Sequence, residues 1–188
     1  MILEPHRFDW LFALESAATL PDRARFPPDG TIVASGPVRS RLRYEISSVI
    51  APDPDTAEDP GTLRRALRVP AGYNPRSVAL AAEWREASRS DEEVVERAID
   101  FLRQGRYVYT LEPPLLGTHS VDEFLFETRA GFCEHYASAF AILMRAAGVP
   151  ARVVTGYQGG ELNAFDNIIT VRQSDAHAWT EVFLRSRG

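Results

Sequence analysis

Apolar and polar residues alternate along the first third of the chain, as they do in half-buried strands. In residues 41–50, Leu42, Tyr44 and Ile46 alternate with charged side chains, which is the two-residue period of a strand with one buried face. The run TIVAS at 31–35 is rich in residues of high strand propensity. Both runs therefore predict strands.

A polar stretch and a mixed stretch follow these strands. Residues 52–61, PDPDTAEDPG, contain three prolines and predict a loop. Residues 66–77, ALRVPAGYNPRS, predict a short strand that leads into a turn. We therefore expect residues 1–74 to form a small β-rich subdomain.

Helical spacing begins at Ser77 and changes the picture. Residues 77–88 are rich in helix formers, and Ser90 followed by Glu93 predicts a capping box at the start of a second helix. The prolines of RYVYTLEPP at 106–114 favour extended chain. Beyond this segment, Ser120 is expected to cap a short helix.

The segment GFCEHYASAFAILMRAAGVP at 131–150 predicts a helix with clear ends. Its middle is dense in alanine, leucine and methionine, Gly148 suits the end of a helix, and Pro150 prevents its continuation. Three strand-like runs follow: ARVVTGY, NIITVR and AWTEVFL. A helix followed by meandering strands indicates an α+β core over residues 75–188 and not a doubly wound sheet.

Composition and charge exclude several functions. The 188 residues are 45% hydrophobic and 25% charged with a net charge of −5, so a buried core is expected and a basic surface for nucleic acid is not. No apolar run reaches the roughly 20 residues that span a bilayer. Charged residues at positions 4, 7, 9 and 15 interrupt the N-terminal stretch, which argues against a signal peptide. The single cysteine excludes an internal disulfide and a multi-cysteine zinc site.

The position of Cys133 gives that lone cysteine a chemical interpretation. It lies in the first turn of the predicted helix 131–148, where unpaired N–H groups and the helix dipole favour a thiolate. His177 opens the last strand-like run, and histidine is the usual proton acceptor for a cysteine nucleophile. We therefore predict that Cys133 and His177 act together, although either residue could simply pack in the fold.

Two other arrangements of these residues are less favourable. His135 is a rival base, but positions two apart on a helix do not face each other, so it is expected to line the pocket or to pack locally. A metal site formed by Cys133, His135 and His177 has mixed ligands that could bind zinc. The helix places the first two ligands badly for this, so no metal is predicted.

Two motifs make the family resemblance. The stretch TRAGFCEHYASAFAILMRAAGVPARVVTGYQGGE, followed by VRQSDAHAWTEVFL, resembles the core of bacterial transglutaminase-like proteins, and the similarity covers roughly residues 70–188. The resemblance implies a papain-like fold without a cofactor, with Cys133 as nucleophile and His177 as base. It also implies an extracytoplasmic location and a membrane-anchored parent protein.

The resemblance implies thiol-dependent acyl transfer from a protein or peptide glutamine to an amine or to water. The alternatives are a cysteine amidase or peptidase of the same fold and a non-catalytic peptide-binding domain. The family's third residue is an aspartate on the next strand, and the sequence stops before that point, so the 188 residues are expected to lack it. Asp175 is a poor substitute because an adjacent side chain is badly placed to reach the far nitrogen of the ring; a turn residue is the better interpretation.

Two aromatic residues are further site candidates. Tyr109, on the extended segment, is a candidate side-chain donor to the oxyanion beside the backbone N–H of Cys133, or else a strand aromatic. Trp179 shares a strand face with His177 and either forms a wall of the pocket or belongs to the core.

If the last strand of the family fold is missing, a sheet edge is left unpaired. Such an edge invites pairing with a second copy. We therefore predict self-association of the 188-residue chain, measured by size-exclusion chromatography. A clean, stable monomer contradicts this prediction.

Overall fold

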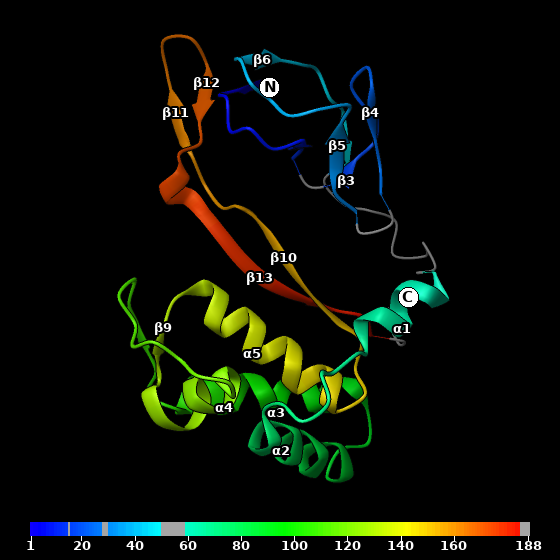
Figure 1. Ribbon diagram of the computed structural model, residues 1–188, viewed down its shortest axis with the longest axis vertical. Helices are drawn as coiled ribbons and strands as arrows, with labels where there is room; N and C mark the ends of the chain where they lie inside the picture. Colours follow the sequence, from blue (N-terminus) through cyan, green and yellow to red (C-terminus); the bar gives the residue numbers. More distant parts are fainter. Residues whose placement is uncertain (15, 28–29, 50–58, 185–188) are drawn as a thin grey trace. The chain divides into compact units, whose positions relative to one another are not determined.

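The computed structural model describes residues 1–14, 16–27, 30–49 and 59–184 (Figure 1). The chain divides into two compact units, Met1–Thr62 and Leu63–Gly188. The structure therefore divides the chain earlier than the boundary expected after residue 74.

The unit Met1–Thr62 is built from short antiparallel strand pairs. Its core is formed by the buried side chains of Leu11, Ile32, Val38 and Tyr44. The Tyr44 hydroxyl donates to the carbonyl of Phe12 at 2.7 Å, and burial raises the pKa of this phenol. The strands are β1 (Ile2–Leu3), β2 (Trp10–Leu11), β3 (Ser16–Ala17), β4 (Ala24–Arg25), β5 (Ile32–Ala34), β6 (Leu42–Arg43) and β7 (Ser48–Val49).

These strands confirm the β-rich character of the first third, with one correction beyond it. TIVAS contains β5, but the run at 41–50 is reduced to β6 and β7. The strand predicted within 66–77 is wrong: the helix α1, Pro60–Ala66, lies just before a turn. Proline suits the first position of a helix, so Pro60 starts α1 instead of prolonging the loop. Most of that predicted loop, residues 52–58, lies outside the described residues.

The unit Leu63–Gly188 follows the predicted order of helices and strands. Its helices and strands are α2 (Pro75–Glu86), α3 (Asp91–Gln104), β8 (Val108–Tyr109), α4 (Ser120–Glu123), a π-helix (Phe124–Thr128), β9 (Ala130–Gly131), α5 (Cys133–Ala146), β10 (Ala151–Tyr157), β11 (Glu161–Asn163), β12 (Ile168–Thr170), a 3₁₀ helix (Gln173–Asp175) and β13 (Ala176–Val182). The predicted α+β architecture is confirmed.

Helix α5 is the centre of this unit. One of its sides packs against the antiparallel pair β10–β13, and another packs against α2, α3 and α4 (Figure 1). Its buried side chains are mainly alanines, which allow neighbouring elements to approach closely, together with Leu143 and Met144. Phe124 and Leu125, from the π-helix, are fully buried against it, and each such side chain contributes roughly 1.5–3 kcal/mol.

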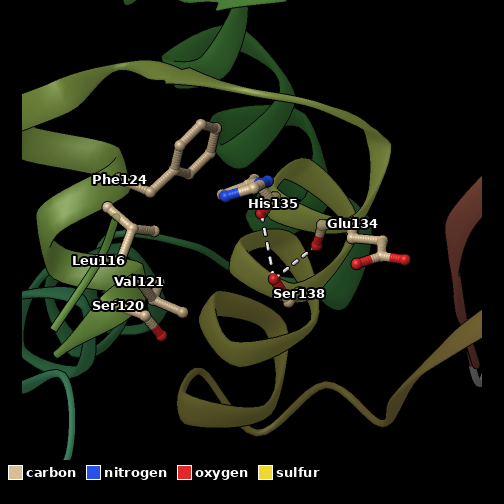
Figure 2. Close-up of a pocket in the computed structure, with 7 residues that line it drawn as sticks. All are labelled: Leu116, Ser120, Val121, Phe124, Glu134, His135 and Ser138. Carbon is tan, nitrogen blue, oxygen red and sulfur yellow. Dashed lines mark hydrogen bonds between the residues drawn. The ribbon is translucent and has the colours of Figure 1, made fainter. Parts of the chain in front are cut away.

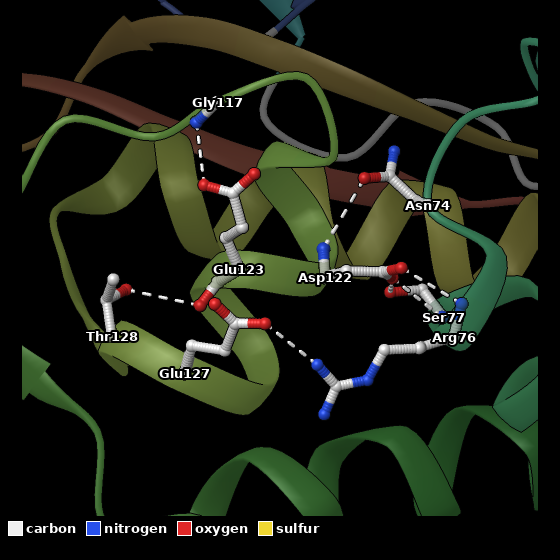
Figure 3. Close-up of polar contacts among 8 residues, drawn as sticks. All are labelled: Asn74, Arg76, Ser77, Gly117, Asp122, Glu123, Glu127 and Thr128. Atoms are coloured by element: carbon white, nitrogen blue, oxygen red, sulfur yellow. Dashed lines mark hydrogen bonds and ion pairs between the residues drawn. The ribbon is translucent and has the colours of Figure 1, made fainter.

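Two helix starts in this unit are capped by side chains from each other's elements (Figure 3). The buried carboxylate of Asp122, on α4, accepts hydrogen bonds from the backbone N–H groups of Arg76 at 2.9 Å and Ser77 at 2.8 Å, and from the Ser77 hydroxyl. In return, the side-chain oxygen of Asn74 accepts the N–H groups of Val121 at 3.1 Å and Asp122 at 3.4 Å. The exchange satisfies groups that a helix start otherwise leaves unpaired.

Of the two helix caps predicted from the sequence, one is wrong and the other is confirmed. Ser120 is the first residue of α4 and not its cap, because Asn74 supplies that cap from 47 residues away. Ser90 does cap α3, accepting the N–H of Glu93 at 3.3 Å. The Glu93 carboxylate in turn accepts the backbone N–H of Arg89, which lies one residue before the N–H that is bonded in the usual capping box.

Replacing Asp122 with alanine should lower the free energy of unfolding by about 3 kcal/mol, because several buried donors lose their acceptor. Urea denaturation measures the change. The control is Glu127→Ala, which removes an exposed ion pair with Arg76 and should cost less than about 1 kcal/mol. Equal losses in the two variants would contradict this account of the capping.

Candidate active site

A pocket of about 330 Å³ in the unit Leu63–Gly188 contains the residues that the sequence singled out. Cys133, His177, Tyr109 and Trp179 all line it. The full lining set is Leu102, Tyr109, Cys133, Tyr136, Ala137, Phe140, His177, Ala178, Trp179 and Thr180.

Cys133 is the first residue of α5 and is half-buried. The preceding residue, Phe132, is extended and forms the N-cap. At this position the helix dipole favours an anion, and the thiol remains accessible from the pocket. The expected location of the cysteine, at the start of a helix, is therefore observed.

His177 lies near the beginning of β13, paired in register with Gly156 of β10. Its ring stacks on that of Trp179, with centroids 6.4 Å apart, as their shared strand face predicts. A Cβ atom at Gly156 would lie 3.1 Å from the Trp179 ring, so the glycine makes room for the indole. Within the part of the chain that the structure describes, no side chain hydrogen-bonds to the His177 ring.

Thr180 ties the strand of His177 to the helix of Cys133. Its hydroxyl donates to the backbone carbonyl of Ala137, on α5, at 2.7 Å. Thr180 and the buried Ala178 alternate with His177 and Trp179 along β13, so the strand turns one set of positions toward α5. This bond fixes the spacing of the two elements at the pocket.

Tyr109 reaches the pocket from the extended segment predicted at 106–114. Strand β8 runs parallel to β9, with Tyr109 opposite Gly131 and the N–H of Thr110 bonded to the carbonyl of Gly131 at 2.9 Å. The Tyr109 ring is 58% exposed and stacks on Tyr136 with centroids 6.2 Å apart. The segment is therefore held beside the start of α5.

Six residues that line the pocket were not recognised as site residues from the sequence, and three of these six lie on α5. Tyr136, Ala137 and Phe140 lie three, four and seven positions after Cys133, the spacing of one helix face. Burial, and then the neighbouring Tyr109 phenol, raise the pKa of Tyr136, so its hydroxyl keeps its proton. Counting from Cys133 at helical spacing is the signal that identifies them.

Two side chains that competed for a role lie elsewhere. The Asp175 carboxylate accepts the N–H of Arg172 at 2.7 Å and closes its own turn, as its interpretation as a turn residue predicted. His135 lines a separate pocket of about 190 Å³ with Glu134, Ser138 and residues of α4 and its surroundings (Figure 2). Among the described residues, no group of three or more histidine, cysteine or acidic side chains is placed to hold a metal.

A helix that begins with a cysteine and packs on antiparallel strands is the core arrangement of papain-related folds. Residues 78–188 match the family model of the transglutaminase-like superfamily. The chain belongs to this superfamily.

Two bacterial proteins show how far the similarity extends. The chain is 44% identical over its whole length to the protein-glutamine gamma-glutamyltransferase of Pseudomonas aeruginosa, of which it spans 28%. It is 32% identical over 131 residues to the uncharacterised protein YebA of Bacillus subtilis, covering 66% of this chain and 18% of YebA.

A solved structure matches the whole chain. The periplasmic domain of TgpA from Pseudomonas aeruginosa superposes with a TM-score of 0.91 at 43% identity, covering 100% of this chain and 67% of that one. The extracytoplasmic location implied by the family resemblance is confirmed by this match to a periplasmic domain. Among the described residues, no helix has the length and apolar character needed to cross a membrane.

Replacing Thr180 with valine should lower the free energy of unfolding by about 1 kcal/mol, because one partly buried hydrogen bond between β13 and α5 is lost. Chemical denaturation measures the loss, and Thr180→Ser should retain most of the stability. The control is Thr155→Val on the neighbouring strand β10, an exposed position where little change is expected. A serine variant as unstable as the valine variant argues against the hydrogen bond as the cause.

Proposed function

We propose that this chain carries the catalytic centre of a thiol-dependent acyl transfer enzyme acting on glutamine side chains. The observation that carries the proposal is that Cys133 and His177, 44 residues apart in sequence, line one pocket. The name of the Pseudomonas relative, a protein-glutamine gamma-glutamyltransferase, supports a protein substrate. Because the chain spans only 28% of that relative, the substrate and the membrane-anchored parent are also parts of this proposal.

The first half of the proposed reaction forms a thioester. His177 takes the proton of the Cys133 thiol, and the thiolate attacks the carbonyl carbon of the glutamine carboxamide. The carbon–nitrogen bond then breaks, and His177 returns the proton to the leaving nitrogen, which departs as ammonia. The acyl group remains bound to the sulfur of Cys133.

The second half resolves the thioester. An amine attacks the acyl carbon, gives a proton to His177, and forms a new amide as the carbon–sulfur bond breaks. The proton then returns to the thiolate of Cys133. Water follows the same course to a carboxylate, so transfer and hydrolysis differ only in the acceptor that reaches the intermediate.

Negative charge on the acyl oxygen needs donors close to Cys133. The backbone N–H of Cys133 is the first, because it lies at the positive end of α5. Tyr109 is proposed as a side-chain donor, since β8 holds it beside Gly131 at the edge of the pocket. Trp179 is proposed as the wall that stacks on His177.

The single cysteine allows a direct test of the nucleophile. With p-nitrophenyl acetate, the chain should release up to one equivalent of p-nitrophenolate in a burst as Cys133 is acetylated. Cys133→Ala should give no burst, and His177→Ala should slow it by about 10²–10⁴-fold through loss of the general base.

A second assay identifies the acceptor. Incorporation of a fluorescent primary amine into a glutamine-containing protein indicates transfer, and ammonia release without incorporation indicates hydrolysis. A Cys133→Ala variant that retains either activity would falsify the assignment. If the full-length parent protein gives no burst, no incorporation and no ammonia release, the non-catalytic peptide-binding alternative is favoured.

A further inference from the structure

The turn that starts α5 is closed by two hydrogen bonds between the same pair of residues. The backbone N–H of His135 donates to the carbonyl of Phe132 at 2.9 Å. In return, the backbone N–H of Phe132 donates to Nδ1 of the His135 ring at 3.3 Å. Cys133 lies between these two residues in the chain.

This arrangement is one half of a capping box, with histidine at the third helical position; the other bond is accepted by the backbone carbonyl of Phe132, because the phenylalanine side chain has no acceptor. Glutamate or glutamine usually stands there and accepts the N–H of the N-cap residue. An imidazole nitrogen that accepts a hydrogen bond carries no proton, so the neutral His135 ring has its proton on Nε2. His135 therefore acts at this site as a backbone acceptor.

Packing holds the His135 ring in that orientation. The ring lies against Phe132, with centroids 4.6 Å apart, and against Phe124 at 5.6 Å. A Cβ atom at Gly131 would come within 2.6 Å of the ring, so the glycine permits this close approach. Figure 2 shows the ring among residues of the smaller pocket, where Ser138 bonds to the carbonyl of Glu134.

The capping bonds select which N–H groups stay unpaired. The start of a helix leaves its first four backbone N–H groups without partners inside the helix. The bonds between Phe132 and His135 satisfy the first and the last of these four. Among the residues that the structure describes, none accepts the N–H groups of Cys133 and Glu134. Those two donors remain available beside the thiol.

We propose that His135 is a positioning residue that holds the first turn of α5 so that the N–H of Cys133 points to the acyl oxygen during catalysis. This proposal rests on the proposed function. It assigns His135 no proton transfer to substrate, because its ring lines a different pocket from Cys133 and His177. In the proposed mechanism, His135 orients the backbone N–H of Cys133, which is the oxyanion donor.

The test compares two substitutions at this position. His135→Gln keeps a side-chain acceptor at the usual capping-box position and should acetylate Cys133 within about threefold of the wild-type rate with p-nitrophenyl acetate. His135→Phe keeps an aromatic ring but removes the acceptor. It should slow acetylation about tenfold or more at saturating ester, with little change in the ester concentration that gives half the maximal rate.

A matched control is available in the same unit. His119 also accepts a backbone N–H through Nδ1, that of Asn74 at 3.1 Å, but it does not line the pocket of Cys133. His119→Phe should therefore leave the acetylation rate unchanged while removing the same kind of bond. Circular dichroism establishes that each variant is folded.

The possible outcomes distinguish a failure of the positioning role of His135 from a failure of the proposed function. A folded His135→Gln chain as slow as His135→Phe overturns the positioning role, as does a His135→Phe chain as fast as wild type. If His135→Phe does not fold, the glutamine variant alone decides. Persistence of the burst in Cys133→Ala, or its absence from the full-length parent protein, instead overturns the proposed function.

Discussion

The burial of α5 is the constraint on which the rest of the unit Leu63–Gly188 depends. This helix must be enclosed by β10 and β13 on one side and by α2, α3 and α4 on another, yet its first residue has to remain accessible. Alanine-rich packing meets both needs, because small side chains let the strands and helices approach closely along the body of the helix. Close packing leaves little freedom to move the cysteine without moving its neighbours.

The same constraint explains how β13 contributes to the pocket. Ala178 is buried and Thr180 bonds to Ala137, so alternate positions of the strand are fixed against α5. His177 and Trp179 occupy the other set and stack on each other. The strand is thus anchored by Ala178 and Thr180, and the positions between them remain available to line the pocket.

Features with local causes were predictable from the sequence. Ser90 caps α3, and Gly148 adopts a positive φ of 79° at the end of α5, because short-range hydrogen bonds and backbone sterics determine both. The cap of α4 was not predictable, since Asn74 lies 47 residues from its partner. The pairing of Cys133 with His177 came from motifs, whereas Tyr136, Ala137 and Phe140 have no motif of their own and follow only from helical spacing counted from Cys133.

In the first two turns of α5, distance along the chain from Cys133 is a poor guide to which side chains share its pocket. Tyr136, Ala137 and Phe140 continue the face of Cys133, because three, four and seven residues bring a helix back to nearly the same direction. Glu134, His135 and Ser138 turn toward the smaller pocket, although two of them are nearer to Cys133 in the chain. His135 still contacts the turn that holds Cys133, because its ring accepts the backbone N–H of Phe132, the residue before the cysteine. A side chain that cannot face the cysteine is therefore well placed to hold the turn on which the cysteine lies.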